Sequence, residues 1–372
     1  MENQTLASPK ESEERETFIA AKERSDSVWA DLDVNAAKYR VLTGDRPTGA
    51  LHIGHYFGTL ANRVKLQQLG VETFILVADY QVLTDREKAT TPHEMIREVL
   101  LDYLAVGLDP FNQNTTIFCH SHIPELNQLM LPFLTLVSVQ ELQRNPTVKE
   151  ELSASSQDSM SASLLTYPVH QAADILFCKG QLVPVGKDQL PHLEMSRKIA
   201  RRFNHRYAKK KRVFPIPTAL LSETPMILGL DGGQKMSKSR GNAIDIKMTP
   251  KETAKAIKRA KTDSDRRITY DEVNRPEVAN LLRLLSLCSN KTPRQWADDI
   301  GDGGSGTLKH ELTEHLNAFL EPIRDRRLDY ANQTGVLEEV IGEGNKRARS
   351  IARETLREVT EAMKIDYGIL AF

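Results

Sequence analysis

The chain has 372 residues, of which 50 are Lys or Arg and 50 are Asp or Glu. This length allows two or three domains with cores of their own, and a net charge of zero means that any basic, nucleic-acid-binding surface must be local. The three cysteines form no CxxC pair, which argues against a disulfide framework and against a zinc site. No apolar run is long enough to span a membrane and the first residues are polar, so we expect a cytoplasmic protein without a membrane anchor.

Residues 1–36 are rich in Glu, Ser and Lys, and we expect a mobile extension with at most one loosely docked helix. After it, apolar strand-like runs alternate with helical patterns. The predicted strands are 39–43, 72–78, 115–119 and 181–185, and the predicted helices are 54–69, 92–106, 124–139, 164–178 and 189–204. Strands separated by helices of this length imply βαβ units and a parallel sheet, whose ligand crevice lies beyond the C-terminal strand ends.

The stretch 40–56, RVLTGDRPTGALHIGHY, reads as the first strand, a glycine-containing turn and the start of a helix. Backbone N–H groups at a helix N-terminus are unpaired and carry partial positive charge, so this place suits a phosphate. His52 and His55 lie three residues apart on one helical face and can both donate hydrogen bonds to one anion. We interpret the turn as a nucleotide site, with a purely structural histidine pair as the alternative.

The chain after residue 144 adds four features. The polar, Ser-rich segment 145–163 predicts a loop. The basic residues within 201–212 indicate either phosphate contact or an ordinary solvated surface. A polar loop, KMSKSRGN, occupies 235–242, and from residue 250 onwards the patterns are helical.

Two motifs in this order resemble the class I aminoacyl-tRNA synthetases: LHIGHY at 51–56 and QKMSKS at 234–239. Three further stretches resemble the tryptophanyl-tRNA synthetase family: LTYPVHQAADIL at 165–176, LVPVGKDQ at 182–189 and TDSDRRITYD at 262–271. The likeness covers nearly everything after residue 37. It implies an α/β fold with a Rossmann-like catalytic domain at 37–234 (including an inserted connecting segment), a KMSKS loop at 235–249 and an α-helical anticodon-recognition region at 250–372.

The resemblance implies a tryptophan–tRNA ligase. Such an enzyme activates L-tryptophan with ATP to tryptophanyl-adenylate, releases pyrophosphate, and transfers tryptophan to the 3′-terminal adenosine of tRNA(Trp). The implied catalytic residues are His52, His55, Lys235 and Lys238. The implied ATP-binding residues are Arg46, Pro47, Thr48, Gly54, His55, Gly186, Lys187, Asp188, Met226, Lys235, Met236, Ser237, Lys238 and Ser239. Mg²⁺ is expected with the ATP phosphates, and no metal is expected to be held by the protein alone.

The implied tryptophan-binding residues are Leu42, Tyr167, Gln171, Asp174, Val183, Val185 and Gln189. By the family's pattern, Asp174 accepts the indole N–H, beside the small pair Ala172-Ala173. Tyrosyl enzymes typically carry a tyrosine on the first strand where this chain has Leu42, which favours tryptophan over tyrosine. The chain departs from commoner tryptophanyl enzymes at Arg46, Gln81, Glu151 and Gln171, which leaves the detailed ATP contacts and the inhibitor response open.

The expected partners are tRNA(Trp), read by the helical region, and a second copy of the chain in a homodimer. A candidate for part of the dimer interface is the apolar set on helix 124–139, for which an ordinary core role is equally favoured: Leu126, Leu129, Met130, Phe133, Leu134 and Val137. Two alternatives remain: a tyrosyl-type synthetase, and a paralogue that serves as a binding module without aminoacylation. Both motifs being intact argues against the second alternative.

Overall fold

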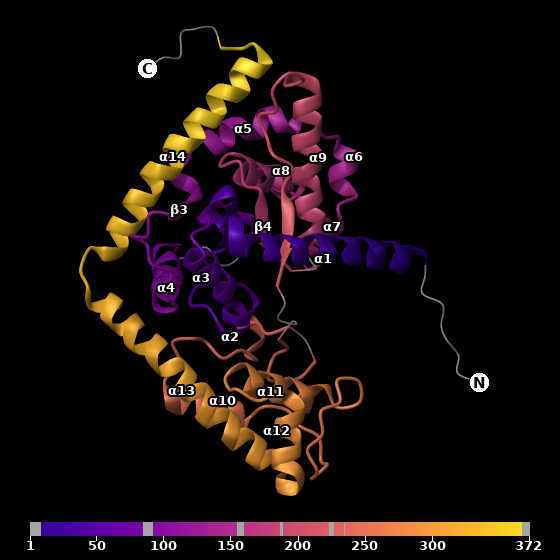
Figure 1. Cartoon of the computed structure of the whole chain (residues 1–372), viewed down its shortest axis with the longest axis vertical. Coiled ribbons are helices and arrows are strands. Elements are labelled where there is room, and N and C mark those ends of the chain that lie inside the picture. The colour runs from indigo at the N-terminus through magenta and orange to yellow at the C-terminus, as the bar shows by residue number, and fades with distance from the viewer. Residues whose placement is uncertain are drawn as a thin grey trace.

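A computed structural model describes residues 9–84, 92–154, 160–186, 189–222, 227–233 and 235–366. Its centre is a five-stranded sheet in the order β3-β2-β1-β4-β5, in which every pairing is parallel. The strands are β1 (Arg40–Asp45), β2 (Glu72–Val77), β3 (Thr115–Cys119), β4 (Leu182–Val185) and β5 (Thr218–Leu221). The four predicted strands are therefore present, and the parallel α/β fold is confirmed (Figure 1).

Helices cover both faces of the sheet. In chain order, the helices before residue 208 are α1 (Pro9–Asn35), α2 (Ile53–His55), α3 (Ala61–Gln68), α4 (Pro92–Ala105), α5 (Glu125–Leu134), α6 (Val139–Gln143), α7 (Pro146–Ala154), α8 (Ala162–Leu176) and α9 (Leu190–Tyr207). Successive residues of β1 point to opposite faces, as the pleat of a strand requires. Val41 packs with Leu66 of α3, whereas Leu42 packs in the core cluster that contains Ala172 and Ala173 of α8.

Three local predictions differ from the structure. The predicted helix 124–139 is divided into α5 and α6, because Ser138 is extended and its side chain caps the second helix together with Glu141. The predicted loop 145–163 contains helix α7, which is polar and therefore lacked an apolar stripe to reveal it. Strand β5 was missed because it has only four residues and follows Pro217.

The N-terminal segment forms the long helix α1, and its second half packs on the sheet. Leu32 is fully buried, and the N–H of Leu221 at the end of β5 donates a hydrogen bond of 2.8 Å to the Ser25 hydroxyl. The indole N–H of Trp29 also donates to the Leu221 carbonyl, at 3.3 Å. This part of the segment is thus docked by specific contacts, whereas the expected mobility of residues 1–36 stays a prediction.

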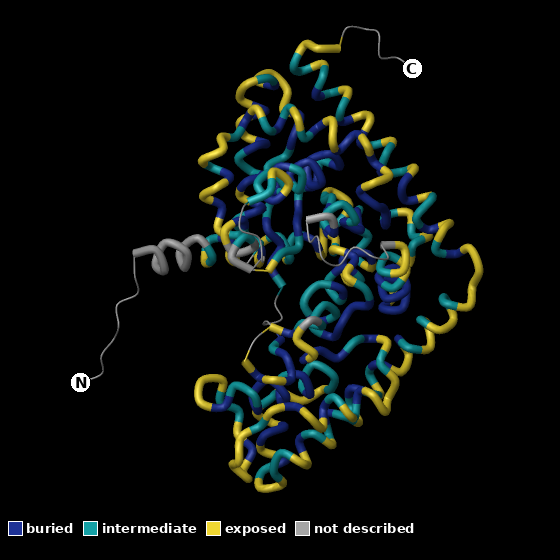
Figure 2. Tube along the Cα trace, turned by 180° about the vertical axis from the view of Figure 1, so that it is seen from behind, coloured by how far each residue is buried: buried dark blue, intermediate teal, exposed yellow. Residues whose placement is uncertain are grey.

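Beyond residue 250 the described chain is helical. Its helices are α10 (Pro250–Lys258), α11 (Pro276–Leu287), α12 (Pro293–Ile300), α13 (Gly304–Asn332) and α14 (Val336–Met363). Figure 1 shows α10, α11 and α12 gathered at one end of the molecule, while α13 and α14 run along one side and return to the sheet. Exposed residues follow the outer side of these two long helices (Figure 2). No described helix is both long and apolar enough to cross a membrane.

Candidate functional site

The loop after β1 brings two histidines into ring contact at the C-terminal end of the central strand. His52 is 5% exposed. Its backbone N–H donates a hydrogen bond of 3.2 Å to Nδ1 of His55, and the centroids of the two imidazole rings are 3.7 Å apart. A side chain at Gly54 would place its Cβ 2.9 Å from Nδ1 of His52, so this position needs glycine for the ring to fit. Because Nδ1 of His55 accepts a hydrogen bond, its Nε2 is left as the donor atom.

Both histidines are neutral at pH 7. Burial lowers the pKa of His52 to about 3, assisted by the neighbouring His55 and Lys238. Burial also lowers the pKa of His55 to about 4, although Asp45 acts in the opposite direction. The imidazoles can therefore donate hydrogen bonds to an anion but supply no positive charge.

A largely buried ion pair between Asp45, the last residue of β1, and Arg63 of α3 supports this turn. Burial alone would raise the pKa of Asp45, but Arg63, whose Nη1 lies 2.5 Å from Oδ2, lowers it to about 2. Tyr103 donates to the same oxygen at 2.6 Å, and Nε of Arg63 donates to the Thr43 hydroxyl at 3.0 Å. The sequence analysis missed this group, whose one local signal is an acidic residue at the C-terminal end of a buried strand.

The loop that begins at residue 235 lies against the histidine turn. The ammonium group of Lys238 donates to the carbonyls of Thr48 and Ala50, at 2.8 and 2.5 Å, and burial lowers its pKa. Met236 is 2% exposed and lies in the apolar cluster that contains Ile53. The two segments predicted to form one site are thus joined by direct contacts, and Lys238 carries its charge to the turn.

Backbone hydrogen bonds fix the same two segments to each other. The N–H of Ile53 donates to the Ile244 carbonyl and that of Ile246 donates to the Leu51 carbonyl, both at 2.9 Å. The N–H of Ser237 donates to Asn242 at 2.8 Å, which holds the loop in a compact turn.

The remaining predicted nucleotide residues are distributed as follows. Arg46, Pro47 and Thr48 form the turn after β1, and Gly186 is exposed just after β4. Lys235 pairs with Leu228 in an isolated β-bridge, and the backbone of Ser239 lies in a short 3₁₀ turn. Three predicted residues lie outside the described part of the chain: Lys187, Asp188 and Met226.

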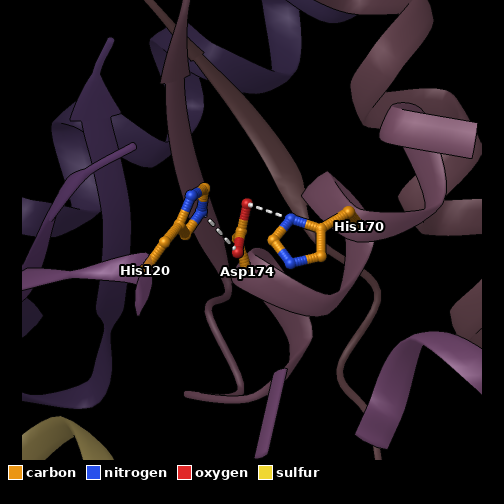
Figure 3. A group of neighbouring side chains, drawn as sticks. All are labelled: His120, His170 and Asp174. Carbon is orange, nitrogen blue, oxygen red and sulfur yellow. Dashed lines mark ion pairs between the residues drawn. The ribbon is translucent and has the colours of Figure 1, made fainter. Parts of the chain in front are cut away.

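A second group surrounds Asp174 on α8 (Figure 3). The Asp174 side chain is 1% exposed, with Nε2 of His120 lying 2.8 Å from Oδ1 and Nδ1 of His170 lying 4.0 Å from Oδ2. Neither approach has the alignment of a hydrogen bond, so both carboxylate oxygens are buried without a hydrogen-bond partner among the described residues. Such an acceptor is costly to bury and is suited to a donor brought by a ligand.

The two histidines beside Asp174 were also missed by the sequence analysis. His120 follows the last residue of β3, a place where parallel sheets present ligand-binding side chains, and His170 precedes Asp174 by one helical turn. The ligand atoms of the three residues lie within 4.8 Å of one another, close enough to be tested as a metal site. Two ligands of one tetrahedral zinc ion are about 3.3 Å apart. The 2.8 Å separation of Nε2 of His120 from Oδ1 of Asp174 is shorter than this, so these two atoms are too close together to be ligands of one such ion as they stand.

The other predicted tryptophan residues lie around α8, β1 and β4. Leu42 and Val183 are buried in the same apolar cluster as Ala172, while Val185 is half-buried at its edge. The hydroxyl of Tyr167 is 3.2 Å from Nε2 of His192, and Gln171 and Gln189 are half-buried. Of the departures noted in the sequence, Gln81 is half-buried and the side chain of Glu151 lies outside the described residues.

Comparison with known proteins identifies relatives over most of the chain. A family model described as class I tRNA synthetases (W and Y) matches residues 35–321. A tryptophan–tRNA ligase of Clostridium longisporum is 42% identical over 343 residues, which is 89% of this chain and 98% of that protein. A tryptophan–tRNA ligase of Treponema pallidum is 41% identical over 334 residues, 87% of this chain and 96% of that protein.

A solved structure is also similar. The tryptophanyl-tRNA synthetase of Campylobacter jejuni, crystallised with ADP and tryptophan, superposes with a TM-score of 0.74 at 30% identity. The match covers 87% of this chain and 99% of that one.

Proposed function

Since this chain belongs to the class I tRNA synthetases of the tryptophan and tyrosine type, we propose that it is a tryptophan–tRNA ligase. The carboxylate of L-tryptophan attacks the α-phosphate of ATP, which gives tryptophanyl-adenylate and pyrophosphate. The 3′-terminal adenosine of tRNA(Trp) then attacks the adenylate carbonyl. The observation that carries the proposal is the joining of the histidine turn to the 235–239 loop by Lys238.

The ATP site lies in this proposal between the histidine turn and that loop. His52 and His55 act as neutral donors to the phosphates, while Lys238 and Lys235 supply the positive charge that offsets charge building on pyrophosphate. The nucleotide is further contacted by the loop residues and by the turns after β1 and β4. This set comprises Arg46, Pro47, Thr48, Gly54, Gly186, Lys187, Asp188, Met226, Met236, Ser237 and Ser239. Mg²⁺ accompanies the phosphates.

The reaction needs no covalent protein nucleophile, and the protonation state of the three cysteine thiols is consistent with this. Burial raises the pKa of Cys119, Cys178 and Cys288 to about 12, so their thiols stay protonated and unreactive at neutral pH. Catalysis then depends on positioning the substrates and on electrostatic stabilisation.

Tryptophan is selected in this proposal by the buried carboxylate of Asp174, which accepts the indole N–H. Phenylalanine offers no donor and would leave the carboxylate unpaired, which is the kind of mismatch that gives synthetases sharp selection. Leu42, Val183 and Val185 line the apolar part of the pocket, and the polar groups of the substrate are held by Tyr167, Gln171 and Gln189. The small residues Ala172 and Ala173 leave room for the larger ring.

The proposal extends to partners and organisation. The helices after residue 250 read the anticodon of tRNA(Trp), the enzyme acts as a homodimer, and it works in the cytoplasm. Residues 37–234 form the catalytic domain and 235–249 the KMSKS loop. The first 36 residues form an extension outside the catalytic machinery.

The deciding experiment is ATP–pyrophosphate exchange with tryptophan, tyrosine and phenylalanine offered separately. We expect exchange with tryptophan alone. Exchange with tyrosine alone would instead identify a tyrosyl enzyme, and no exchange with any of them would leave the chain as a binding module.

A further inference from the structure

A buried carboxylate outside the predicted site holds the backbone of the histidine turn. Asp102 of α4 is completely buried, and its Oδ2 accepts a hydrogen bond of 2.5 Å from the N–H of Leu51, the residue before His52. Its Oδ1 accepts a hydrogen bond of 2.7 Å from Nε of Arg327 on α13. Burial raises the pKa of Asp102 to about 6 although Arg327 acts to lower it, so the carboxylate is ionised at pH 7.

Arg327 is also linked, through Glu98, to the segment that follows the 235–239 loop. Its Nη2 donates to Glu98 at 2.8 Å, and the same Glu98 oxygen accepts from Nζ of Lys247 at 2.7 Å. Lys247 directly follows Ile246, whose N–H is bonded to the Leu51 carbonyl. Both backbone polar groups of Leu51 are therefore fixed, and both connections lead to one arginine on α13.

Aromatic contacts join the same helix to the residues that follow His55. The ring of Phe319 on α13 stacks on Phe57, with centroids 5.4 Å apart and planes at 28°, and packs edge-on against Tyr56 at 5.1 Å. Phe319 and Arg327 lie eight residues apart, about two helical turns, so Phe319 can contact the turn and Arg327 can contact Asp102 from the same side of α13. The turn is consequently held at both ends by the C-terminal helical region.

A purely structural role is the alternative reading of a buried ion pair. Such pairs often contribute little net stability, because the cost of removing two charges from water offsets their attraction. Here, however, one carboxylate oxygen of Asp102 accepts a hydrogen bond from a single backbone N–H, that of Leu51, the residue immediately before His52. A misplacement of about 1 Å in a substrate-positioning segment is enough to cost a large part of an enzyme's rate.

We propose that Asp102 and Arg327 are positioning residues through which α13 sets the conformation of the histidine turn, so that the C-terminal helical region controls ATP binding. This inference rests on the proposed function, because it takes the turn to be the ATP site. It assigns a role in the reaction to two residues that touch no substrate, and it links a helix of the C-terminal region to the first step of catalysis.

The test measures KM for ATP and for tryptophan in tryptophan-dependent ATP–pyrophosphate exchange by the full chain. Asp102→Ala removes the acceptor of the Leu51 N–H, and we expect KM for ATP to rise about tenfold with KM for tryptophan changed less than about twofold. Asp102→Asn keeps an acceptor oxygen, so most of the ATP affinity should return. A matched control is Glu358→Gln, which breaks the 2.6 Å ion pair of α14 with Lys179 and should leave both KM values unchanged.

A second pair of variants tests the positioning role of Asp102 and Arg327 even if Asp102→Ala fails to fold. Arg327→Met leaves Asp102 buried without its partner and should raise KM for ATP. Adding Asp102→Asn to Arg327→Met removes the unpaired charge, and should restore thermal stability and much of the ATP affinity. An unchanged KM for ATP in Arg327→Met, or equal rises for ATP and tryptophan, would overturn the inference. Absence of exchange in the unmodified chain would instead overturn the proposed function.

Discussion

The two histidines of the turn differ from surface histidines in their protonation, and this difference is measurable. Because burial lowers their pKa values to about 3 and about 4, the imidazole NMR signals of His52 and His55 should not shift between pH 8 and about pH 5.5. Their signals are assigned by comparison with His52→Gln and His55→Gln. A midpoint above about pH 5.5 for either ring would contradict the neutral-donor role.

The same shifts predict the pH dependence of stability from these two groups. Unfolded histidines bind protons at about pH 6.5, so between about pH 6.5 and pH 3 the unfolded chain holds more protons than the folded one. The free energy of unfolding should therefore fall as the pH falls through this window. Urea titrations of the unmodified chain and of the His52→Gln/His55→Gln variant isolate the contribution of the pair. Between about pH 6.5 and pH 3 the free energy of unfolding of the unmodified chain should fall more steeply than that of the variant, and equal slopes would contradict the neutral state of the two rings.

Asp174 makes a different prediction, because its buried carboxylate has no hydrogen-bond partner among the described residues. Asp174→Ala should raise KM for tryptophan about a hundredfold and leave KM for ATP nearly unchanged, since only the indole loses its acceptor. The steady-state exchange assay measures both values. Asp26→Ala, which removes an exposed carboxylate of α1, is the control and should change neither. Equal effects of Asp174→Ala on both substrates would reject its role in recognising the indole.

At the scale of elements, α14 approaches β3 so closely that a glycine is required. A Cβ at Gly344 would lie 1.8 Å from the carbonyl oxygen of Ile117, and neither backbone can move aside cheaply. Gly344→Ala should lower the free energy of unfolding by about 3 kcal/mol in urea titrations. Gly342→Ala is the matched control, because open space surrounds that position, and alanine should stabilise the helix there by about 1 kcal/mol. Equal effects would show that the helix does not lie against β3 as described.

The elements that could be predicted are those whose information is local. The apolar runs of β2 and β3 and the helices between them carry their own periodicity, so the parallel sheet followed from the sequence. The missed groups depend on partners far apart along the chain. Asp102 and Arg327 are separated by 225 positions, and nothing near either residue indicates that they meet. His120 and Asp174 were likewise joined only by the folding of β3 against α8.

For the molecule as a whole, the proposed homodimer needs an apolar surface that one chain leaves exposed. The expected interface on helix 124–139 is corrected in part, because Leu126, Leu129 and Phe133 are buried in the chain's own core. On the same α5–α6 segment, Leu131 is 69% exposed and Val139 is 58% exposed. Large exposed apolar side chains of this kind are common in subunit interfaces, so we expect a dimer to bury Leu131 and Val139.

This surface gives a direct test of assembly by sedimentation equilibrium. A charge at the centre of an apolar interface must be buried without a partner, so Leu131→Asp should convert dimers to monomers at concentrations where the unmodified chain is dimeric. Phe111→Asp is the matched control, because Phe111 is also 59% exposed but lies in the loop after α4. A dimer that survives Leu131→Asp but not Phe111→Asp would place the interface at the loop after α4 instead.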